Sequence, residues 1–377
     1  MSRVRLVIAN PWGERLGGAE NILWTLLRHL DAARVEPLVV FFDGGSFVGE
    51  VAAAGIRTEV LQTRRLRKGG RFLVASTRLR SLLSRERPDA MLGWGPKPQI
   101  YLGPVSASLG LSRRNVWMLL ERPGHPVHHL ASRLPAAAIA CLSGFIEQDV
   151  QALAPRAETF VVHPGIELPE EPSPGSVAAV RNRLRLPAGR TVVGMVARLA
   201  PVKGQHHALA ALGQLRARGV DAHLLCVGGD AHGLAPEYEP RLRELAAELG
   251  IEEAVTFAGH VADPRPYLAL FDVFLSAAPD EGFGIALLEA MAFGVPIVAV
   301  DAGGPREIVE RDGSGVLVES AAPEHLAPAL ARLVTDPELR RVLGAAARER
   351  VRSHFTAERM AAEVTRRLEE VASRNGG

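Results

Sequence analysis

The chain has 377 residues, of which 47% are hydrophobic, 23% are charged and 5% are aromatic. This length favours two domains, and the apolar fraction excludes a wholly disordered chain. No apolar run approaches the roughly 20 residues needed to span a bilayer, and the apolar stretch near the N-terminus is too short for a signal-peptide core. Two cysteines, Cys141 and Cys226, are too few for a disulfide scaffold or a cysteine zinc site. We therefore expect a cytoplasmic protein.

The net charge of +2 conceals an asymmetry along the chain. Residues 1–166 carry a balance of +8, whereas the remainder carries −6. A basic half joined to an acidic half indicates that the two halves meet different partners.

The first half alternates short apolar runs with amphipathic segments. A helix is expected over residues 19–30, after a Gly-Gly turn. Strands are expected at residues 4–9, 38–42, 90–92, 116–120, 136–142 and 160–163. Short apolar strands separated by helical stretches are typical of a parallel sheet that is covered on both faces.

Residues 164–176 are dense in proline, glycine and serine, which predicts an interdomain linker. A second alternating series follows, and the chain from residue 323 onward is expected to be helical. Strands are expected at 192–197, 222–227, 255–258, 273–276 and 297–300, and helices at about 204–218, 237–249 and 284–293. The pattern favours an α/β chain of two tandem doubly wound units, with ligands at the carboxyl ends of the strands and in a cleft between the units.

The most informative segment runs from residue 278 to residue 300. It follows an expected strand, turns through Gly282 and Gly284, and opens a helix. Glycines allow a close backbone approach, and a helix N-terminus offers unpaired N–H groups to a phosphate or diphosphate. Glu281 precedes this helix and Glu289 lies about two turns inside it, a spacing that disfavours a hydrolytic carboxylate pair. The two glutamates suit a site that binds hydroxyls at opposite ends of an elongated ligand.

The Glu281–Glu289 pair, with seven residues between, resembles the signature of retaining glycosyltransferase family four, whose members have the GT-B fold. Other segments resemble the same family in the same order, at residues 17–20, 162–166, 196–204, 301–307 and 312–318. The resemblance covers nearly the whole chain. It is strong over residues 191–318 and diffuse over most of 31–160.

The resemblance implies two Rossmann-like domains that face each other across a cleft. Residues 1–165 would bind the acceptor, with a helix at about 356–377 packing back on them, and residues 166–355 would bind a nucleotide-sugar. The implied reaction moves a sugar from a nucleoside diphosphate, with uridine favoured over guanosine, to a glycan or lipid-linked acceptor in polysaccharide or glycoconjugate biosynthesis. Retention of the anomeric configuration and independence of any metal or other cofactor are also implied.

The family motifs assign roles to individual residues. Glu289 would bind ribose hydroxyls, Glu281 donor-sugar hydroxyls, and Arg198 and Lys203 the diphosphate. The implied catalytic residues are Glu281, Arg198, Lys203 and His125. The implied donor-binding residues are Gly17, Gly18, Arg198, Lys203, His260, Val261, Glu281, Gly282, Phe283, Gly284, Ile285 and Glu289. Phe283 and Gly284 would act through backbone N–H groups, and His260 and Val261 would line the base pocket.

The residues themselves support part of this assignment. Arg198 and Lys203 follow a buried-type strand, and two cations at that edge form an anion site by charge alone. They would stabilise the charge that develops on a departing diphosphate without a metal. The alternatives are a surface cation pair, a simple helix-entry turn at Gly17 and Gly18, and a solvated position for Glu289.

The histidine-rich loop after residue 120 has several interpretations. His125, His128 and His129 lack the further ligands that a metal site needs. His125 is the candidate for the cleft group beside the transferred sugar, and Glu121 or Arg122 could fill the same role. A solvated histidine is an equal alternative.

Residues 64–87 concentrate positive charge, with apolar residues interleaved. A solvated helix with an ordinary core-facing side explains this pattern, and so does attachment to the anionic inner face of a membrane or binding of an anionic lipid-linked acceptor. Nucleic acid is disfavoured because stacking aromatics are scarce.

Two rival functions remain open at this point. One is a nucleotide-sugar epimerase or hydrolase on the same fold, which needs no acceptor. The other is a non-catalytic module that binds a sugar nucleotide.

Overall fold

The computed structural model describes residues 3–15, 17–63, 69–230, 233 and 235–374. The described chain divides into two compact units, Met1–Gly165 with Thr356–Gly377, and Ile166–Phe355. Both units have the residue boundaries expected above, whereas their roles as acceptor and donor domains stay predictions. Residues 64–68, the start of the expected basic stretch, lie outside the described residues.

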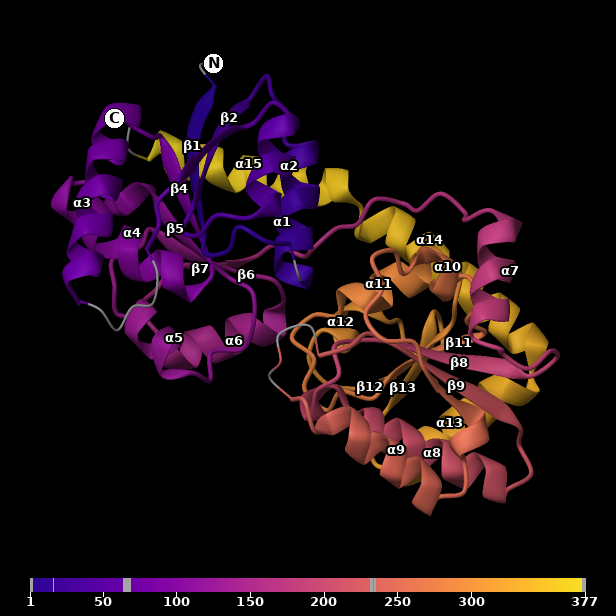
Figure 1. The fold of residues 1–377 in the computed structure, drawn as a ribbon. Helices are drawn as coiled ribbons and strands as arrows, with labels where there is room; N and C mark the ends of the chain where they lie inside the picture. The colour runs from indigo at the N-terminus through magenta and orange to yellow at the C-terminus, as the bar shows by residue number, and fades with distance from the viewer. Residues whose placement is uncertain (1–2, 16, 64–68, 231–232, 234, 375–377) are drawn as a thin grey trace. The chain divides into compact units, whose positions relative to one another are not determined.

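Unit 1 is built on a parallel sheet of seven strands in the order β3-β2-β1-β4-β5-β6-β7 (Figure 1). The strands are β1 (Val4–Asn10), β2 (Val35–Phe41), β3 (Arg57–Val60), β4 (Ala90–Trp94), β5 (Asn115–Leu119), β6 (Ala138–Cys141) and β7 (Thr159–Val161). The helices are α1 (Gly18–His29), α2 (Ser46–Ala53), α3 (Gly69–Glu86), α4 (Pro96–Ser108), α5 (Pro126–Ala131), α6 (Gly144–Leu153) and α15 (Ala357–Ser373). The strand order reverses between β1 and β4, where Ala9 pairs with Gly93.

Unit 2 contains a parallel sheet of six strands in the order β10-β9-β8-β11-β12-β13. The strands are β8 (Thr191–Val196), β9 (Ala222–Val227), β10 (Val255–Phe257), β11 (Val273–Ser276), β12 (Ile297–Val300) and β13 (Gly315–Val318). The helices are α7 (Pro174–Arg183), α8 (Gln205–Ala217), α9 (Tyr238–Glu248), α10 (Arg265–Leu268), α11 (Ile285–Ala292), α12 (Pro305–Ile308), α13 (Pro323–Thr335) and α14 (Pro337–His354). Here the order reverses between β8 and β11.

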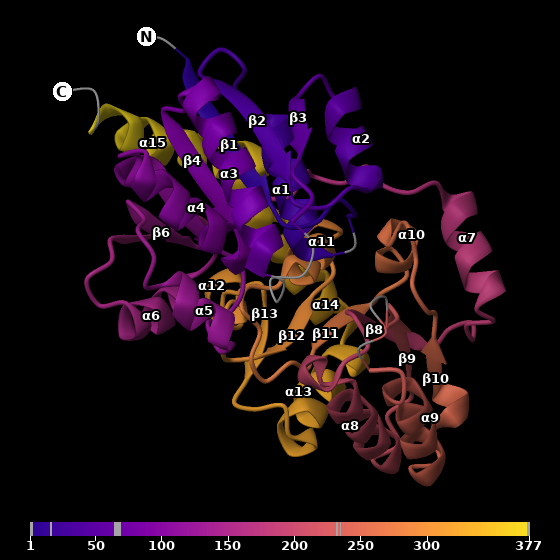
Figure 2. The same ribbon diagram turned by 60° about the vertical axis from the view of Figure 1, so that its left-hand side comes forward.

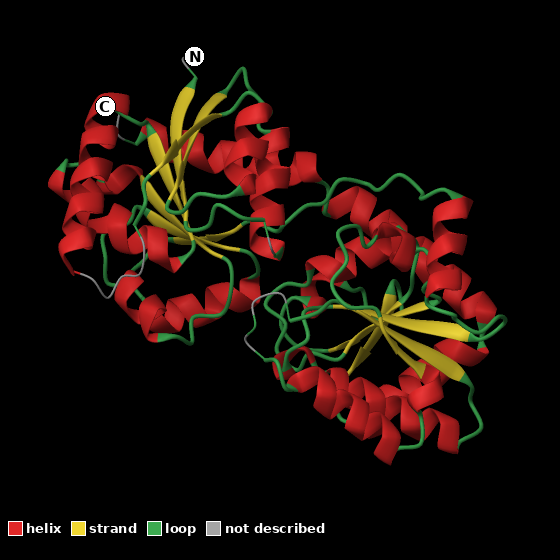
Figure 3. Cartoon of the chain, in the orientation of Figure 1, coloured by secondary structure: helices red, strands yellow, loops and turns green. Residues whose placement is uncertain are grey.

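Helices cover both faces of each sheet (Figure 3). In unit 1, α3 and α4 pack together on one face, and α1 and α15 pack together on the other. In unit 2, α8, α9 and α13 form one layer, and α11 and α14 pack together in the other. Because both faces are covered, every residue of β4, β5 and β9 is buried, which explains their continuous apolar runs. The expected pair of doubly wound parallel sheets is confirmed.

Helix α15 belongs to unit 1 although it lies at the far end of the chain (Figure 2). Its apolar side, which includes Met360, Val364 and Leu368, is buried, and the helix packs on α1, β1 and β4. The chain passes between the units twice, and the two passages touch. The Ile166 N–H donates to the Phe355 carbonyl at 2.9 Å, and a Cβ on Gly165 would lie 2.0 Å from the Thr356 carbonyl oxygen.

Three local expectations need correction. Strands β3 and β13 were not expected, and residues 174–176 of the expected linker form the first turn of α7. β3 is an edge strand whose residues are exposed or half-buried, so it carries no apolar run to reveal it. The Ser173 side chain accepts a hydrogen bond from the Ser176 N–H, which starts a helix inside a segment of loop-like composition.

Candidate functional site

Two loops of unit 2 meet at the point where its strand order reverses. One loop follows β8 and carries Arg198 and Lys203, and the other follows β11 and leads to Gly284. Gly204 sits at φ +73°, and a Cβ there would lie 2.0 Å from the carbonyl oxygen of Ala277. The close contact of the two loops therefore requires a glycine. This edge of an open α/β sheet is where ligands of such folds bind.

An ion pair joins the two loops. Lys203 Nζ lies 2.7 Å from Glu281 Oε2, and the side chains are 29% and 17% exposed. A partly exposed pair of this kind contributes modestly to stability. Its clearer effect is geometric, because it holds a cation and a carboxylate side by side where the two loops meet.

The loop before α11 is held by its backbone. Gly284 is the N-cap of α11 at φ +111°, and no side chain caps the helix. The Gly304 N–H donates to the Glu281 carbonyl at 2.8 Å, and a Cβ on Gly304 would lie 2.1 Å from Phe283 Cα. The Phe283 ring is buried and contacts the Phe355 ring edge-on, with centroids 6.2 Å apart. A rigid loop thus leads into an uncapped helix N-terminus, which attracts anions.

Arg198 is exposed near the start of the loop that follows β8. Its side chain makes no ion pair and no hydrogen bond with the part of the chain that the structure describes. Its carbonyl accepts a hydrogen bond from Gln205 Nε2 at 2.9 Å, which holds the loop. The guanidinium is therefore available to an anionic ligand.

Glu289 lies inside α11 in a different electrostatic situation. The residue is partly exposed, yet burial raises the pKa of its carboxyl to about 7, because the surrounding protein removes water from the charged form. Among the described residues, none forms a hydrogen bond or ion pair with this carboxyl. Burying a charged carboxyl without a hydrogen-bond partner costs free energy. This cost would be offset if the hydroxyls of a bound ligand donated hydrogen bonds to Glu289.

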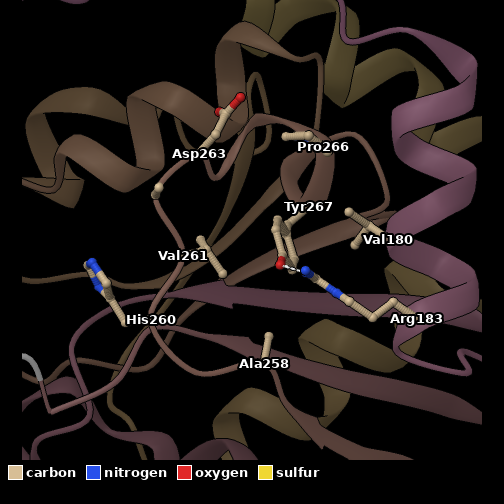
Figure 4. Close-up of a pocket in the computed structure, with 9 residues that line it drawn as sticks. Val180, Arg183, Ala258, His260, Val261, Asp263, Pro266 and Tyr267 are labelled. Carbon is tan, nitrogen blue, oxygen red and sulfur yellow. Dashed lines mark hydrogen bonds between the residues drawn. The ribbon is translucent and has the colours of Figure 1, made fainter.

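His260 and Val261 follow β10 and line a cavity of about 360 Å³ (Figure 4). Arg183 and Tyr267 lie on the opposite side of this cavity, where the guanidinium donates to the phenol oxygen. The His260 side chain points away from that pair in Figure 4. The hydrogen bond from the Gly228 N–H to the Gly259 carbonyl, 2.9 Å long, holds the loop at its base.

The remaining expected residues belong to unit 1. Gly17 is the N-cap of α1 and Gly18 its first residue, and a Cβ on Gly18 would meet nothing within 4 Å. The fold itself therefore does not require a glycine at position 18.

The histidine loop is organised differently from a simple solvated loop. His125 caps α5, because its Nδ1 accepts a hydrogen bond from the Val127 N–H at 3.3 Å. His128 is buried, and its Nε2 lies 3.3 Å from Glu121 Oε1. Arg122, an alternative to His125, forms an ion pair with Asp149 at 2.6 Å. His125 stays a candidate for the group beside the transferred sugar, because its Nε2 is not used in capping α5. Arg122 is instead held by its ion pair with Asp149.

Two further observations concern the described residues as a set. They contain no group of three or more His, Cys, Asp or Glu side chains arranged to hold a metal ion, and metal independence stays a prediction. None of their helices has the length and apolarity that crossing a membrane requires.

The sequence interpretation missed two positioning residues, Gln205 and Gly304. Gln205 is buried and holds the Arg198 carbonyl, and Gly304 supports the Phe283 backbone. Their signal was present, since Gln205 directly follows the 196–204 segment and Gly304 lies within the 301–307 segment. Their roles depend on contacts between distant loops, which the sequence does not reveal.

Comparisons with known proteins find glycosyltransferases for both units. Residues 177–350 match the model of "Glycosyl transferases group 1", and residues 16–170 match that of "Glycosyltransferase Family 4". The chain is 31% identical to a GDP-mannose-dependent alpha-(1-6)-phosphatidylinositol monomannoside mannosyltransferase of Mycobacterium tuberculosis, over 97% of each chain. It is 27% identical to the lipopolysaccharide core biosynthesis glycosyltransferase LpsE of Rhizobium meliloti, over 91% of this chain and 93% of that protein. The crystal structure of Anabaena Alr3699/HepE with UDP and glucose matches with a TM-score of 0.83 and 25% identity, over 98% of this chain and 100% of that one.

Proposed function

Because the chain belongs to the group 1 glycosyltransferases and has their GT-B fold, we propose that it transfers a sugar from a nucleoside diphosphate to a hydroxyl of a glycan or lipid-linked acceptor. We further propose that the anomeric configuration is retained and that no metal takes part. Unit 2 would bind the donor and unit 1 the acceptor.

The observation that carries this proposal is the constellation at the unit 2 switch point. The loops that follow the neighbouring strands β8 and β11 carry the Lys203–Glu281 ion pair, the uncapped N-terminus of α11 and the Arg198 guanidinium, which pairs with none of the described residues. Two cations and a helix N-terminus favour a diphosphate. The carboxyl groups of Glu281 and Glu289 can accept hydrogen bonds from hydroxyls at the two ends of such a ligand.

In the proposed reaction the bond between the anomeric carbon and the diphosphate oxygen breaks, and the electron pair leaves with the diphosphate. The acceptor oxygen forms the new bond to the anomeric carbon, and its proton passes to the departing diphosphate. Negative charge grows on the diphosphate in the transition state, where Arg198, Lys203 and the backbone N–H groups before α11 oppose it. Glu281 would hold the sugar hydroxyls while Lys203 keeps its carboxylate in place.

The donor's base stays open between uridine, which the sequence favours, and guanosine. The Anabaena structure contains UDP, whereas the mycobacterial relative is named for GDP-mannose. We propose that the cavity beside Val261 receives the base, since it lies at the carboxyl edge of the same sheet.

Contact with an anionic membrane remains part of the proposal for the acceptor. Helix α3 exposes Leu73 and Val74, with the exposed Arg78 one turn further along and no acidic residue before Glu86. Apolar side chains beside cations are typical of peripheral membrane contact. Lipid-linked acceptors would be presented at such a surface.

A thermal-shift panel of UDP- and GDP-sugars tests the donor, because a ligand that binds the folded state raises its stability. We expect one nucleotide to raise the melting temperature with or without EDTA. Donor turnover should be slow without an acceptor, and NMR of the product should show a retained anomeric configuration. Rapid donor turnover without an acceptor would instead indicate an epimerase or hydrolase, and the absence of any nucleotide shift would overturn the proposal.

A further inference from the structure

A second cavity of unit 2, with a volume of about 390 Å³, lies at the edge of the sheet opposite to the candidate site. Thr191 and Asp272 line it, and they lie where the parallel strands β8 and β11 begin. The loops that carry Arg198 and Glu281 follow the ends of the same two strands. Strand β8 spans six residues, which is about 20 Å at 3.3 Å per residue. A ligand in this cavity would therefore not compete with a nucleotide at the candidate site.

Three arginines from different parts of unit 2 line this cavity: Arg181 of α7, Arg190 just before β8, and Arg340 of α14. Arg181 donates a hydrogen bond to the Pro187 carbonyl at 3.3 Å. Arg340 donates to two carbonyl oxygens in the last turn of α13, at 2.7 and 2.9 Å. Among the described residues, neither of these two guanidinium groups has a carboxylate within 4 Å. Neutral acceptors thus hold both groups in place and leave their charges uncompensated.

The charges around the cavity do not cancel. Asp272 is the acidic residue of the described lining, and its Oδ2 accepts a hydrogen bond from the Val192 N–H at 2.8 Å. Three cations and one carboxylate leave the lining with a net charge of +2. Arg190 has Asp221 at 2.8 Å, but that carboxylate also faces Arg216 at 3.6 Å, so counting this second pair leaves the balance at +2. Like charges gathered in one recess repel one another unless an anion lies between them.

This concentration of positive charge contrasts with the rest of the acidic half of the chain. Residues 181–190 contain four arginines and no aspartate or glutamate, whereas the chain after residue 166 has a balance of −6. The loop between α7 and β8 is also fixed, because Leu186 is buried and its N–H donates to the Arg181 carbonyl at 3.1 Å. Arg181 and Arg190 are therefore positioned at the cavity before any ligand binds, which lowers the entropic cost of binding.

We propose that this cavity binds a phosphate group in its doubly charged form. The planar fork of arginine matches the oxygens of a phosphate, and a phosphate ester carries a charge of about −1.5 to −2 at pH 7, which balances the lining. A carboxylate would supply only one of these charges. The site is separate from the proposed sugar transfer and does not depend on it. The same group occurs in a soluble phosphate ester and in the headgroup of phosphatidic acid.

Calorimetric titration of the full chain with inorganic phosphate tests this site, with acetate at equal ionic strength as the singly charged control. We expect phosphate to bind and acetate not to bind. Arg181→Ala should weaken phosphate binding by at least about tenfold, because a charge-assisted hydrogen bond is lost, and alanine is well tolerated in a helix. Asp272→Asn should tighten binding by a few-fold, because it removes the opposing charge while the amide oxygen can still accept from the Val192 N–H. Arg241→Ala removes an exposed cation of α9 outside the cavity lining and should bind like the wild type.

The candidate site of unit 2 can also attract phosphate, so the titration is repeated with Lys203→Ala. Phosphate binding that persists in Lys203→Ala and is weakened by Arg181→Ala supports the proposal. The proposal would be overturned by absence of phosphate binding to the wild type, by equal binding of acetate, or by equal phosphate binding to the wild type and Arg181→Ala.

Vesicles of phosphatidylcholine with and without phosphatidic acid separate the two sources of the phosphate group. A gain on phosphatidic acid that is lost in Arg181→Ala indicates a lipid headgroup. Binding of inorganic phosphate with no such gain indicates a soluble phosphate ester.

Discussion

At the scale of single residues, the two glutamates of the unit 2 site differ in how their charge is compensated. Glu281 has Lys203 at 2.7 Å, whereas Glu289 has no partner among the described residues and a pKa raised to about 7. In the proposed function Glu281 acts on the sugar through a fixed carboxylate, and Glu289 gains its hydrogen-bond partners only with the nucleotide. The two residues should therefore respond differently to substitution and to pH.

Glu289 should make the folding stability depend on pH. Its pKa in the folded state lies above the ordinary value of 4.5, so the folded state holds the proton more tightly than the unfolded state. Stability from this group is complete below pH 4.5 and falls, by at most ~3 kcal/mol, as the pH rises through about 7. Urea unfolding of the wild type and Glu289→Gln at pH 5 and pH 8 should show a larger loss in the wild type. Equal losses would contradict the proposed desolvation.

Glu281 and Lys203 should separate catalysis from nucleotide binding. We expect Glu281→Ala to lower the transfer rate by about 100-fold or more while free nucleotide binds nearly as in the wild type, because this carboxylate is assigned to the sugar. Lys203→Ala should impair transfer and also weaken nucleotide binding by about tenfold, because a charge-assisted bond to the diphosphate is lost. Steady-state kinetics and calorimetric titration of the free nucleotide measure the two effects. Unchanged transfer by Glu281→Ala would refute its role.

At the scale of elements, the turn before α12 supports the loop before α11. Gly304→Ala would place a methyl group 2.1 Å from Phe283 Cα, so the loop must shift, at a cost of about 1–3 kcal/mol in stability. Nucleotide binding should weaken with it. For stability alone, Gly18→Ala is the matched control, because open space surrounds that position and alanine is the better helix former. Chemical unfolding measures both variants, and a stability loss in Gly18→Ala alone would contradict this account.

The elements also show what the sequence can predict. Strands buried on both faces, such as β4 and β9, carry unbroken apolar runs that identify them. The edge strand β3 reads Arg-Thr-Glu-Val and pairs on one side only, so its pattern gives no such signal. The family motifs bring Lys203 and Glu281 into one site, but their ion pair depends on β8 lying next to β11. That adjacency arises from strand order, which links positions 78 residues apart in the sequence.

At the scale of the whole molecule, unit 1 depends on the return of α15. Leu368 is buried in the face of α15 that packs on unit 1, so Leu368→Ala should destabilise unit 1 by about 2–4 kcal/mol. Unit 2 should keep its stability, because it has its own core. Hydrogen exchange should show faster exchange in β1 and β4 and unchanged exchange in β8 and β11. Equal acceleration in both sheets would show that the two units unfold together.

The place of α15 after unit 2 in the sequence has a consequence for synthesis on the ribosome. Residues 166–355 are continuous, so the nascent chain can finish unit 2 as soon as they have emerged. Unit 1 begins first, but its last helix, residues 357–373, is synthesised roughly 10–40 s after residue 165 at typical elongation rates. During that interval the apolar surface that α15 covers on α1, β1 and β4 is exposed. The half that is made first is thus completed last, and it is the half that chaperones would need to protect.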